Sequence, residues 1–230
     1  MIKLERTSVM NFENALRGMR NPMNSWDKSD SYYSCEDCDC QTRCAENCAC
    51  CDWSRVGSVY IIGDNDLDLA RRLVKAGSDH RKFLRQIFVS VDVTAPLYWW
   101  KEYDTYKVGT VANSCSTMHR IHAKPFEMAD FSCDRMSGDA AVVLSTVIGV
   151  LEKNRLRYIE TSDKTYWDNM IKLLPSSYNQ MRTCTLNYEN LLNIYFARRH
   201  HKLDEWHIYC DWIAGLPYFR EICIKAMEEM

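Results

Sequence analysis

Seven of the twelve cysteines lie in one short stretch of the chain. Thiolates bind zinc and other soft or borderline cations, and the turn Cys35-Glu-Asp-Cys38 can direct two sulfurs at one ion. Because no histidine lies in the stretch, a metal site here would be all-sulfur, which favours structural zinc over catalytic zinc. The candidate metal ligands are Cys35, Cys38, Cys40, Cys44, Cys48, Cys50 and Cys51.

Two other interpretations of this stretch stay open. Cys50 and Cys51 are adjacent and ligate one ion poorly, so a disulfide loop and a reduced, irregular loop remain alternatives. The other cysteines are scattered among apolar neighbours, and free cysteines in such surroundings are usually small buried residues. We therefore expect burial for Cys115, Cys133, Cys184, Cys210 and Cys223.

Composition and charge exclude several classes of protein. The 230 residues are 47% hydrophobic and 26% charged, as in an ordinary globular protein. A net charge of −2 argues against a general nucleic-acid binder. The longest nearly apolar run, 140–151, is shorter than the roughly 20 residues that span a bilayer. No signal peptide is visible, so we expect a cytoplasmic protein with no membrane partner.

Hydrophobic periodicity predicts the elements that must position any site. Apolar residues at helical spacing follow Gly63-Asp64, with Gly77 at the position that ends such a helix. Ile87 to Thr94 alternates between apolar and polar residues and predicts a strand. Pro96 then opens a helix whose Trp99-Trp100 pair we expect in the core.

The second half of the sequence reads as mainly helical. We predict helices over 139–153, 163–174, 177–200, 203–215 and 218–230. Residues 22–56 have no clear period and form an irregular cysteine-rich insertion. The expected fold is α/β (α+β), one domain over 1–230 with a small mixed sheet flanked by helices.

Two stretches resemble the flavin-dependent thymidylate synthases. The first is an order of elements: a helix ending at Ala76-Gly77, a turn with Phe83, an alternating strand, Ala95-Pro96 and an aromatic helix. The second is Leu174-Pro175 followed by further matching positions at the family's spacing. Those positions are Thr185-Leu-Asn187, Leu191-Leu192-Asn193, Arg198 and, offset by about one residue, Trp206. Together they cover roughly residues 64–215, and the cysteine stretch is no part of the family pattern.

The resemblance implies a homotetramer that binds FAD and a pyrimidine nucleotide, dUMP in the family. It implies methylenetetrahydrofolate and NADPH as further partners, and transfer of a one-carbon unit to the C5 atom of the base. By position in the family pattern, Asn187 and Asn193 would contact the flavin and Arg198 the nucleotide. Asn offers a donor and an acceptor, and Arg offers a planar fork of donors, which suits these ligands. Arg85 or Gln86 takes the place of a family His near the flavin.

The chain departs from the family signature at charged positions. The Arg-His-Arg motif falls at Thr105-Tyr106-Lys107, where only Lys107 keeps a cation. The following motif keeps Asn113 and Ser116, but its Glu becomes Ser114 and its Arg becomes Met118, with Arg120 just beyond. A further family Arg becomes Ile171. The candidate nucleotide ligands are therefore Arg198, Ser116, Asn113, Lys107 and Arg120.

Three functions remain open at this point. The leading one is a flavin-dependent enzyme of the thymidylate synthase type, making dTMP or a hydroxymethylated product. The second is a flavin- or nucleotide-binding protein without catalysis on the same scaffold. The third is a zinc-dependent interaction protein in which the cysteine stretch is the functional part.

Overall fold

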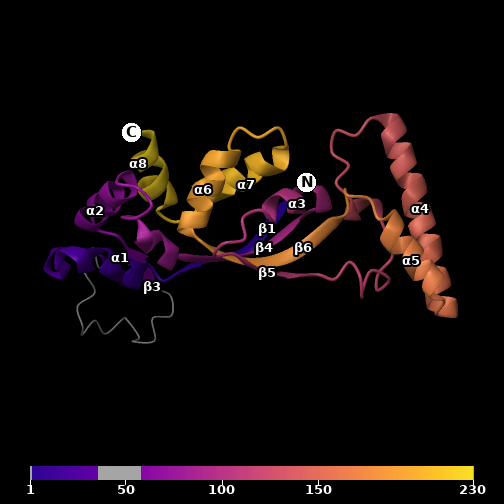
Figure 1. Ribbon diagram of the computed structural model, residues 1–230, viewed down its shortest axis with the longest axis horizontal. Helices are drawn as coiled ribbons and strands as arrows, with labels where there is room; N and C mark the ends of the chain where they lie inside the picture. The colour runs from indigo at the N-terminus through magenta and orange to yellow at the C-terminus, as the bar shows by residue number, and fades with distance from the viewer. Residues whose placement is uncertain (1, 36–57, 230) are drawn as a thin grey trace. The chain divides into compact units, whose positions relative to one another are not determined.

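The computed structural model describes residues 2–35 and 58–229. Helices and short strands alternate along these residues (Figure 1), which confirms the mixed α/β class. By internal contacts the chain divides into two compact units. The first comprises Met1–Ser8, Ser90–Leu186 and Arg198–Cys210, and the second Val9–Val89, Asn187–Ala197 and Asp211–Met230.

The first unit is built on a four-stranded sheet with the order β1–β4–β6–β5. Its strands are β1 (Lys3–Met10), β4 (Phe88–Pro96), β5 (Val111–Ser114) and β6 (Asn179–Asn187).

Neighbouring strands of this sheet run antiparallel where their contacts define the direction. β5 pairs with β6 so that Asn113 lies opposite Thr183. Between β6 and β4, the Thr183 hydroxyl donates to Asp92 at 2.6 Å, and the Thr185 hydroxyl lies 3.5 Å from that of Ser90. A later residue of β6 meets an earlier residue of β4, which makes this pair antiparallel too. The sheet is therefore antiparallel at these pairs, where the sequence suggested a mixed one.

Strand β4 follows the alternation that the sequence predicted. Val89, Val91 and Val93 are buried on one face, and Asp92 lies on the other. β-branched side chains pack well on a pleated, half-buried surface. The alternation of Ile87 to Thr94 therefore located the strand to within two residues of its ends.

Strand β6 corrects the predicted helix over 177–200. Residues Asn179–Asn187 are extended, and the helix α6 spans only Tyr188–Arg198. In β6, Cys184 and Leu186 are buried while Thr183 and Thr185 are exposed, which is the two-residue period of a strand. Pairing with β4 and β5 outweighed the helix-compatible apolar spacing further along the segment.

The helix α3 (Leu97–Tyr103) brings an aromatic core to the first unit. Trp99 and Trp100 are fully buried, as expected. The Trp99 ring lies 5.0 Å from Tyr103, 4.7 Å from Trp206 and 5.3 Å from Tyr209, measured between ring centroids. Such contacts place the helix α7 (Asp204–Ala214) beside α3 through its Trp206 and Tyr209 side chains.

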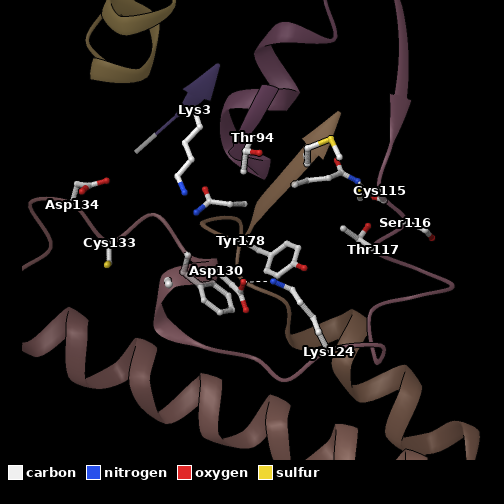
Figure 2. A pocket seen from close by; sticks show the side chains of 15 residues that line it. Lys3, Thr94, Cys115, Ser116, Thr117, Lys124, Asp130, Cys133, Asp134 and Tyr178 are labelled. Carbon is white, nitrogen blue, oxygen red and sulfur yellow. Dashed lines mark hydrogen bonds and ion pairs between the residues drawn. The ribbon is translucent and has the colours of Figure 1, made fainter. Parts of the chain in front are cut away.

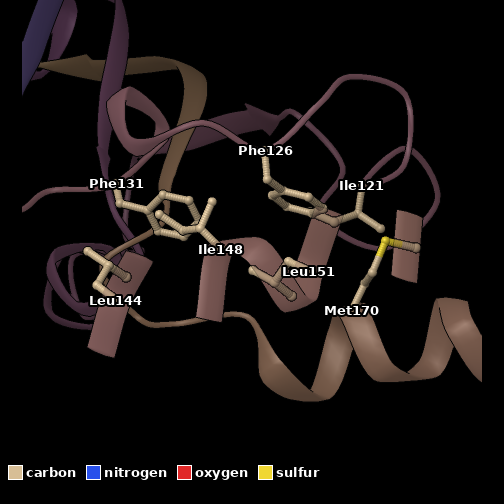
Figure 3. Close-up of a cluster of buried hydrophobic side chains, with 7 residues drawn as sticks. All are labelled: Ile121, Phe126, Phe131, Leu144, Ile148, Leu151 and Met170. Carbon is tan, nitrogen blue, oxygen red and sulfur yellow. The ribbon is translucent and has the colours of Figure 1, made fainter. Parts of the chain in front are cut away.

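A second cluster of buried side chains holds α4 (Gly138–Thr161) against α5 (Lys164–Leu173). Figure 3 shows Leu144, Ile148 and Leu151 of α4 facing Phe126, Phe131 and Met170. The helix α4 continues beyond the predicted end at Lys153, and Ser162 closes it in a left-handed conformation with φ 57°.

The second unit is mainly helical. Its elements are α1 (Phe12–Arg20), the 3₁₀ turns η1 (Asn21–Met23), η2 (Trp26–Lys28) and η3 (Lys82–Gln86), α2 (Asp64–Lys75), α6, the π-helical turn η5 (Arg220–Ile224) and α8 (Lys225–Glu228). The antiparallel pair β2 (Tyr32–Cys35) and β3 (Ser58–Ile61) lies at the two edges of the cysteine segment. The short turn η4 (Met128–Asp130) belongs to the first unit.

The start of α2 is fixed by a side chain far back in the sequence. Asp30 accepts hydrogen bonds from the backbone N–H groups of Asn65 and Asp66 at 2.9 and 3.1 Å. Helix N-termini carry unpaired N–H groups, so an aspartate placed there stabilises the helix. Gly77 has φ 103° just past the end of α2, as its position in the sequence predicted.

Two buried ion pairs join the elements of the second unit. Arg20 of α1 donates to Asp66 of α2 at 2.5 Å, with side-chain exposures of 4% and 0%. Arg81 binds both carboxylate oxygens of Glu189, at 3.0 to 3.2 Å.

Among the described residues, no helix is both long and apolar enough to cross a membrane.

Candidate functional site

The nucleotide candidates Asn113 and Ser116 lie at the end of β5 and just beyond it. Asn113 is exposed on β5. The Ser116 hydroxyl accepts the backbone N–H groups of Met118 and His119, at 3.3 and 2.9 Å, and so shapes the turn after the strand. The Asn113 amide is exposed to solvent, and the Ser116 hydroxyl is engaged with its own turn.

A cavity of about 410 Å³ lies beside this turn. Figure 2 shows Cys115, Ser116 and Thr117 on one side of it, and Lys124, Asp130 and Tyr178 at its base. Its charged lining residues are Lys3, Lys124, Asp130 and Asp134, two of each sign.

Two ionisable groups of this cavity, Lys124 and Tyr178, have displaced pKa values. Burial opposes the charge of Lys124, but the hydrogen bond and charge of Asp130 prevail and raise the pKa of its ammonium. Burial raises the pKa of Tyr178, so its hydroxyl stays protonated and can donate to a ligand. The cavity thus offers a cation, a phenol and carboxylates without a strong net charge.

Gln180 of β6 ties the turn at Cys115 to the sheet. Its Nε2 donates to the Cys115 carbonyl at 2.7 Å, and its Oε1 accepts from Arg182 Nε at 3.0 Å. Arg182 also pairs with Asp104 at 2.7 Å and lies 4.1 Å from the Trp100 ring. This network engages Arg182 in contacts within the first unit.

Arg198, the nucleotide candidate at the end of α6, lies in an ordered cluster of the first unit. Its Nε donates to the Tyr106 hydroxyl at 2.9 Å, and its Nη1 to Glu102 Oε2 at 2.8 Å. Its guanidinium lies 4.9 Å from the centroid of the Trp206 ring. These contacts hold the plane of the guanidinium, so Arg198 is oriented before any ligand arrives.

Glu102 is the centre of this cluster. The same Oε2 also accepts from Trp206 Nε1 at 3.1 Å and lies 3.2 Å from His201 Nε2. His201 Nδ1 accepts the backbone N–H of Leu203 at 3.1 Å, which assigns the ring proton to Nε2. The side chains of Arg198 and Glu102 are 20% and 34% exposed, so a ligand can reach them.

Sequence reasoning found Arg198 but not the side chains that orient it. The Tyr106 hydroxyl accepts from Arg198, a contact that the sequence did not indicate. Glu102 lies in the last turn of α3 and Tyr106 lies three residues beyond its end, so helical spacing could not have indicated that both contact Arg198. His201 and the cavity residues Lys3, Lys124 and Tyr178 carried no motif.

The two remaining nucleotide candidates are exposed cations. Lys107 and Arg120 are both solvent-exposed. Neither side chain makes an ion pair or hydrogen bond within residues 2–35 and 58–229. They are available to an anion, and the structure brings neither into the Arg198 cluster.

The flavin candidates all lie in the second unit. The backbone bond from Tyr188 N to Ile87 O, 3.0 Å, joins the start of α6 to the end of η3. Asn187 and Gln86 are the sequence neighbours of the two bonded residues, so this hydrogen bond brings them together. Asn187 is 8% exposed, and its Oδ1 accepts the Asn190 N–H at 3.0 Å, so it caps α6.

Arg85 and Asn193 fit a flavin ligand better than Asn187 does. Arg85 is exposed, and its only described hydrogen bond is a long one of 3.5 Å to the Ser78 carbonyl. Asn193 is exposed on α6. A free guanidinium suits a pyrophosphate and a free amide suits the imide edge of a flavin ring, so this donor set is compatible with FAD.

The scattered cysteines agree with expectation except at one position. Cys184, Cys210 and Cys223 are buried, and burial raises the pKa of the Cys184 thiol to about 11. Cys133 is half-buried. Cys115 is exposed, contrary to the expectation, because it follows β5 at the rim of the cavity.

The predicted zinc site falls mostly outside the described residues. Cys38, Cys40, Cys44, Cys48, Cys50 and Cys51 lie there, and Cys35 ends β2. Within the described ranges, no group of three or more His, Cys, Asp or Glu side chains could hold a metal ion. Zinc binding by the cysteine segment therefore stays a prediction.

Comparison with known proteins shows similarity in structure. No family model matches the sequence, and no curated protein is similar enough in sequence to be counted as a relative. Thymidylate Synthase X (ThyX) from Helicobacter pylori, determined with FAD and dUMP, superposes with a TM-score of 0.65 at 15% identity. The match covers 99% of this chain and 100% of that one.

Two further structures agree with this result. ThyX from Helicobacter pylori complexed with FAD and dUMP gives a TM-score of 0.63 at 15% identity, over 98% of both chains. The UMP/dUMP methylase PolB from Streptomyces cacaoi, bound with 5-Br dUMP, gives 0.58 at 13% identity, over 98% of this chain and 95% of that one. The chain therefore has the fold of the flavin-dependent thymidylate synthases, in a divergent form.

Proposed function

We propose that this protein binds FAD and a pyrimidine deoxynucleotide, dUMP or a close analogue, and transfers a one-carbon unit to C5 of the base. The observation that carries the proposal is the agreement in fold over 99% of the chain with a structure determined with FAD and dUMP. The methylase PolB supports the same class of substrate, since its structure contains 5-Br dUMP.

Arg198 is the residue we assign to the nucleotide. Glu102, Tyr106 and Trp206 fix its guanidinium, which leaves Nη2 as the part of the fork outside the Glu102 and Tyr106 bonds. A pre-oriented donor loses little side-chain entropy when it binds an oxygen of the base or the phosphate. Asn113, Lys107 and Arg120 supply exposed donors on the same unit and are the candidates for the remaining polar contacts.

Arg85 and Asn193 are the residues we assign to the flavin, with Asn187 and Gln86 beside them. When bound, FAD supplies the redox chemistry, and the chain supplies binding, orientation and exclusion of water. Methylenetetrahydrofolate as donor and NADPH as reductant complete the proposed reaction. The balanced charge of the 410 Å³ cavity suits the polar but uncharged parts of such ligands.

We also propose that the protein assembles with copies of itself, as a homotetramer. On α4, the side chains of Val142, Val143 and Ile159 are 67%, 63% and 55% exposed. Exposed large apolar side chains can mark interfaces between proteins. This surface is the candidate interface between copies.

A second candidate function is a flavin- or nucleotide-binding protein without catalysis. One observation favours it: the cations of the Arg-His-Arg signature are replaced by Thr105 and Tyr106, and Tyr106 is engaged with Arg198. Fewer cations at the substrate leave less charge stabilisation for the reaction. The zinc-dependent interaction protein stays a third possibility, which depends on the cysteine segment.

One experiment separates the first two functions. The purified protein is supplied with FAD, dUMP, methylenetetrahydrofolate and NADPH, and dTMP or a hydroxymethylated nucleotide is measured by chromatography. Product formation that Arg198→Gln abolishes and Arg157→Gln preserves supports the enzyme, because the ion-pair partner of Arg157 among the described residues is Glu160, on the exposed side of α4. Binding of FAD and dUMP without product supports the binding protein.

A further inference from the structure

A second cavity, in the second unit, has no part in the proposed function. Its volume is about 300 Å³, and α1, η2 and the β2–β3 pair form its walls. The lining side chains that matter are Arg17, Arg20, Trp26, Ser29, Ser31 and Tyr60. None of the residues predicted to contact flavin or nucleotide lines it.

A buried arginine with an unsatisfied donor lies in the wall of this cavity. Arg20 is 3% exposed; its Nε donates to Asp66 and its Nη1 to the Ser25 carbonyl at 3.2 Å. Its Nη2 is buried and has no hydrogen-bond partner among the described residues. Buried donors are almost always paired, and an arginine stays charged, so this N–H group marks a place for an acceptor oxygen.

A second arginine, Arg17, lines the cavity together with the carboxylate of Glu13. Arg17 lies three residues before Arg20 on α1, is exposed, and has no ion pair or hydrogen bond in the part of the chain that the structure describes. Asp66 neutralises Arg20. The carboxylate of Glu13 accepts from the Tyr33 hydroxyl at 3.1 Å. The charges of the two arginines are thus matched by Glu13 and Asp66, and the preference for an acceptor oxygen comes from the N–H groups of Arg17 and Arg20 that have no partner among the described residues.

The other walls are aromatic. Trp26 is 50% exposed, and its Nε1 donates to Asn21 Oδ1 at 2.8 Å, which fixes the ring. Tyr33 and Tyr60 pack edge to face with centroids 4.9 Å apart. Burial raises the pKa of Tyr60 to about 12, so the phenol stays neutral and adds no negative charge. Fixed, partly exposed rings offer flat surfaces on which another ring can stack.

We propose that this cavity binds a small aromatic oxyanion, a single ring that carries a carboxylate or a phosphate group. The acid group would meet Arg17 and Arg20, and the ring would lie against Trp26 and the tyrosines. A volume of 300 Å³ lies at the lower end of the roughly 300–1,000 Å³ usual for ligand sites. That size suits one ring and is too small for a dinucleotide such as FAD.

Calorimetric titration of the full chain with phenyl phosphate and with benzoate tests the proposal. We expect at least one of them to bind with a dissociation constant below about 1 mM, and the one that binds identifies the acid group. Arg17→Gln should weaken binding about tenfold through loss of a charged hydrogen bond. Trp26→Ala should weaken it about threefold to tenfold through loss of stacking.

Three controls make the test specific. Arg72→Gln should leave the affinity unchanged, because Arg72 is an exposed arginine of the same unit that pairs with Asp68 and does not line the cavity. Arg198→Gln should also leave it unchanged, which separates this site from the proposed nucleotide site. Inorganic phosphate and cyclohexanecarboxylate should bind at least about threefold more weakly than the matching aromatic acid.

The proposal is overturned by any of three results: no binding of either aromatic acid, equal binding of the non-aromatic probes, or binding that Arg17→Gln and Trp26→Ala leave intact. The side chains of Arg17 and Trp26 are exposed, so we expect both variants to fold. Circular dichroism of the two variants checks this.

Discussion

The two units each contain an arginine–carboxylate pair, and the pairs differ in their access to water. In the second unit, Arg20 and Asp66 are 4% and 0% exposed and are surrounded by hydroxyl groups that also bind Asp66. In the first unit, Arg198 and Glu102 are 20% and 34% exposed. Breaking a buried pair leaves an uncompensated charge, whereas an exposed pair contributes little to stability and can exchange its partner. The Arg20–Asp66 pair supports the fold, and the Arg198–Glu102 pair is suited to ligand binding.

Asp66→Ala should have the largest effect on stability. It leaves the buried charge of Arg20 unpaired, so we expect the free energy of unfolding to fall by about 3–5 kcal/mol. Urea denaturation measures it. Asp68→Ala, two residues along the same helix, is the matched control: its exposed pair with Arg72 should contribute about 0–1 kcal/mol. Equal losses in the two variants would contradict the assignment.

The same pair predicts an acid-dependent loss of stability. Burial opposes the charge of Asp66, but hydrogen bonds from Ser31, Ser29 and Arg20 prevail and lower its pKa below the ordinary 3.8. A lowered pKa means that the stabilisation is present above pH 3.8 and is lost as the pH falls through the folded-state value. Urea midpoints of wild type should therefore fall more steeply below pH 4 than those of Asp66→Asn; parallel curves would exclude this role.

Gly63→Ala should have the next largest effect. An added Cβ would collide with the Asp30 carboxyl group and lie 2.6 Å from the Asp30 carbonyl oxygen, where Asp30 caps α2. Overpacking of this kind costs about 1–3 kcal/mol of unfolding free energy. Gly149→Ala in α4 has nothing within 4 Å of the added Cβ and should stabilise the helix by about 0.5–1 kcal/mol. Thermal unfolding of the two variants should shift in opposite directions.

Glu102→Gln tests the ligand-binding side of the comparison. The pair is partly exposed, so the free energy of unfolding should change by about 1 kcal/mol or less. Affinity for dUMP should fall about tenfold, because Arg198 loses the charged bond that orients it. Equilibrium binding of dUMP to the FAD-loaded protein measures this. Unchanged or tighter binding would show that Glu102 does not position Arg198 for the nucleotide.

Substitutions on the exposed face of α4 should have the smallest effect on stability. Val142→Lys combined with Ile159→Lys should change the unfolding free energy by about 0.5 kcal/mol or less, because both side chains are exposed. Analytical ultracentrifugation should nevertheless show dissociation of the assembly. Leu151→Ala on the buried face of the same helix should cost about 2–5 kcal/mol instead. An unaltered assembly in the double variant would remove α4 from the interface.

The sequence predicted the regular elements where one period dominated. The alternating valines of β4 and the helical spacing before Gly77 located a strand and a helix correctly. It failed at 179–187, where Thr183 and Thr185 alternate with buried residues but adjoin a genuinely helical segment. Which interpretation holds there depends on strand partners far away in the chain, and local periodicity contains no information about them.

Of the side chains in the cluster around Arg198, only Arg198 was named as a candidate from the sequence. Arg198 followed from a spaced pattern, whereas Glu102, Tyr106 and His201 become its neighbours only through the packing of α3 beside α7. The same limit applies to Cys115: we expected burial for it as for the other scattered cysteines, and its place after β5 exposes it. Side chains that assemble through tertiary contacts leave little trace in a single sequence.

The most direct test of the central claim is an absorption spectrum of the purified protein with FAD, recorded before and after addition of dUMP. We predict that the protein retains or takes up FAD, with bands near roughly 370 and 450 nm, and that dUMP perturbs these bands. The perturbation should need about tenfold to a hundredfold more dUMP in Arg198→Gln, since one charged hydrogen bond is lost. A protein that takes up no FAD, or a flavin spectrum that dUMP leaves unchanged, would contradict the proposal that this fold acts on a pyrimidine nucleotide.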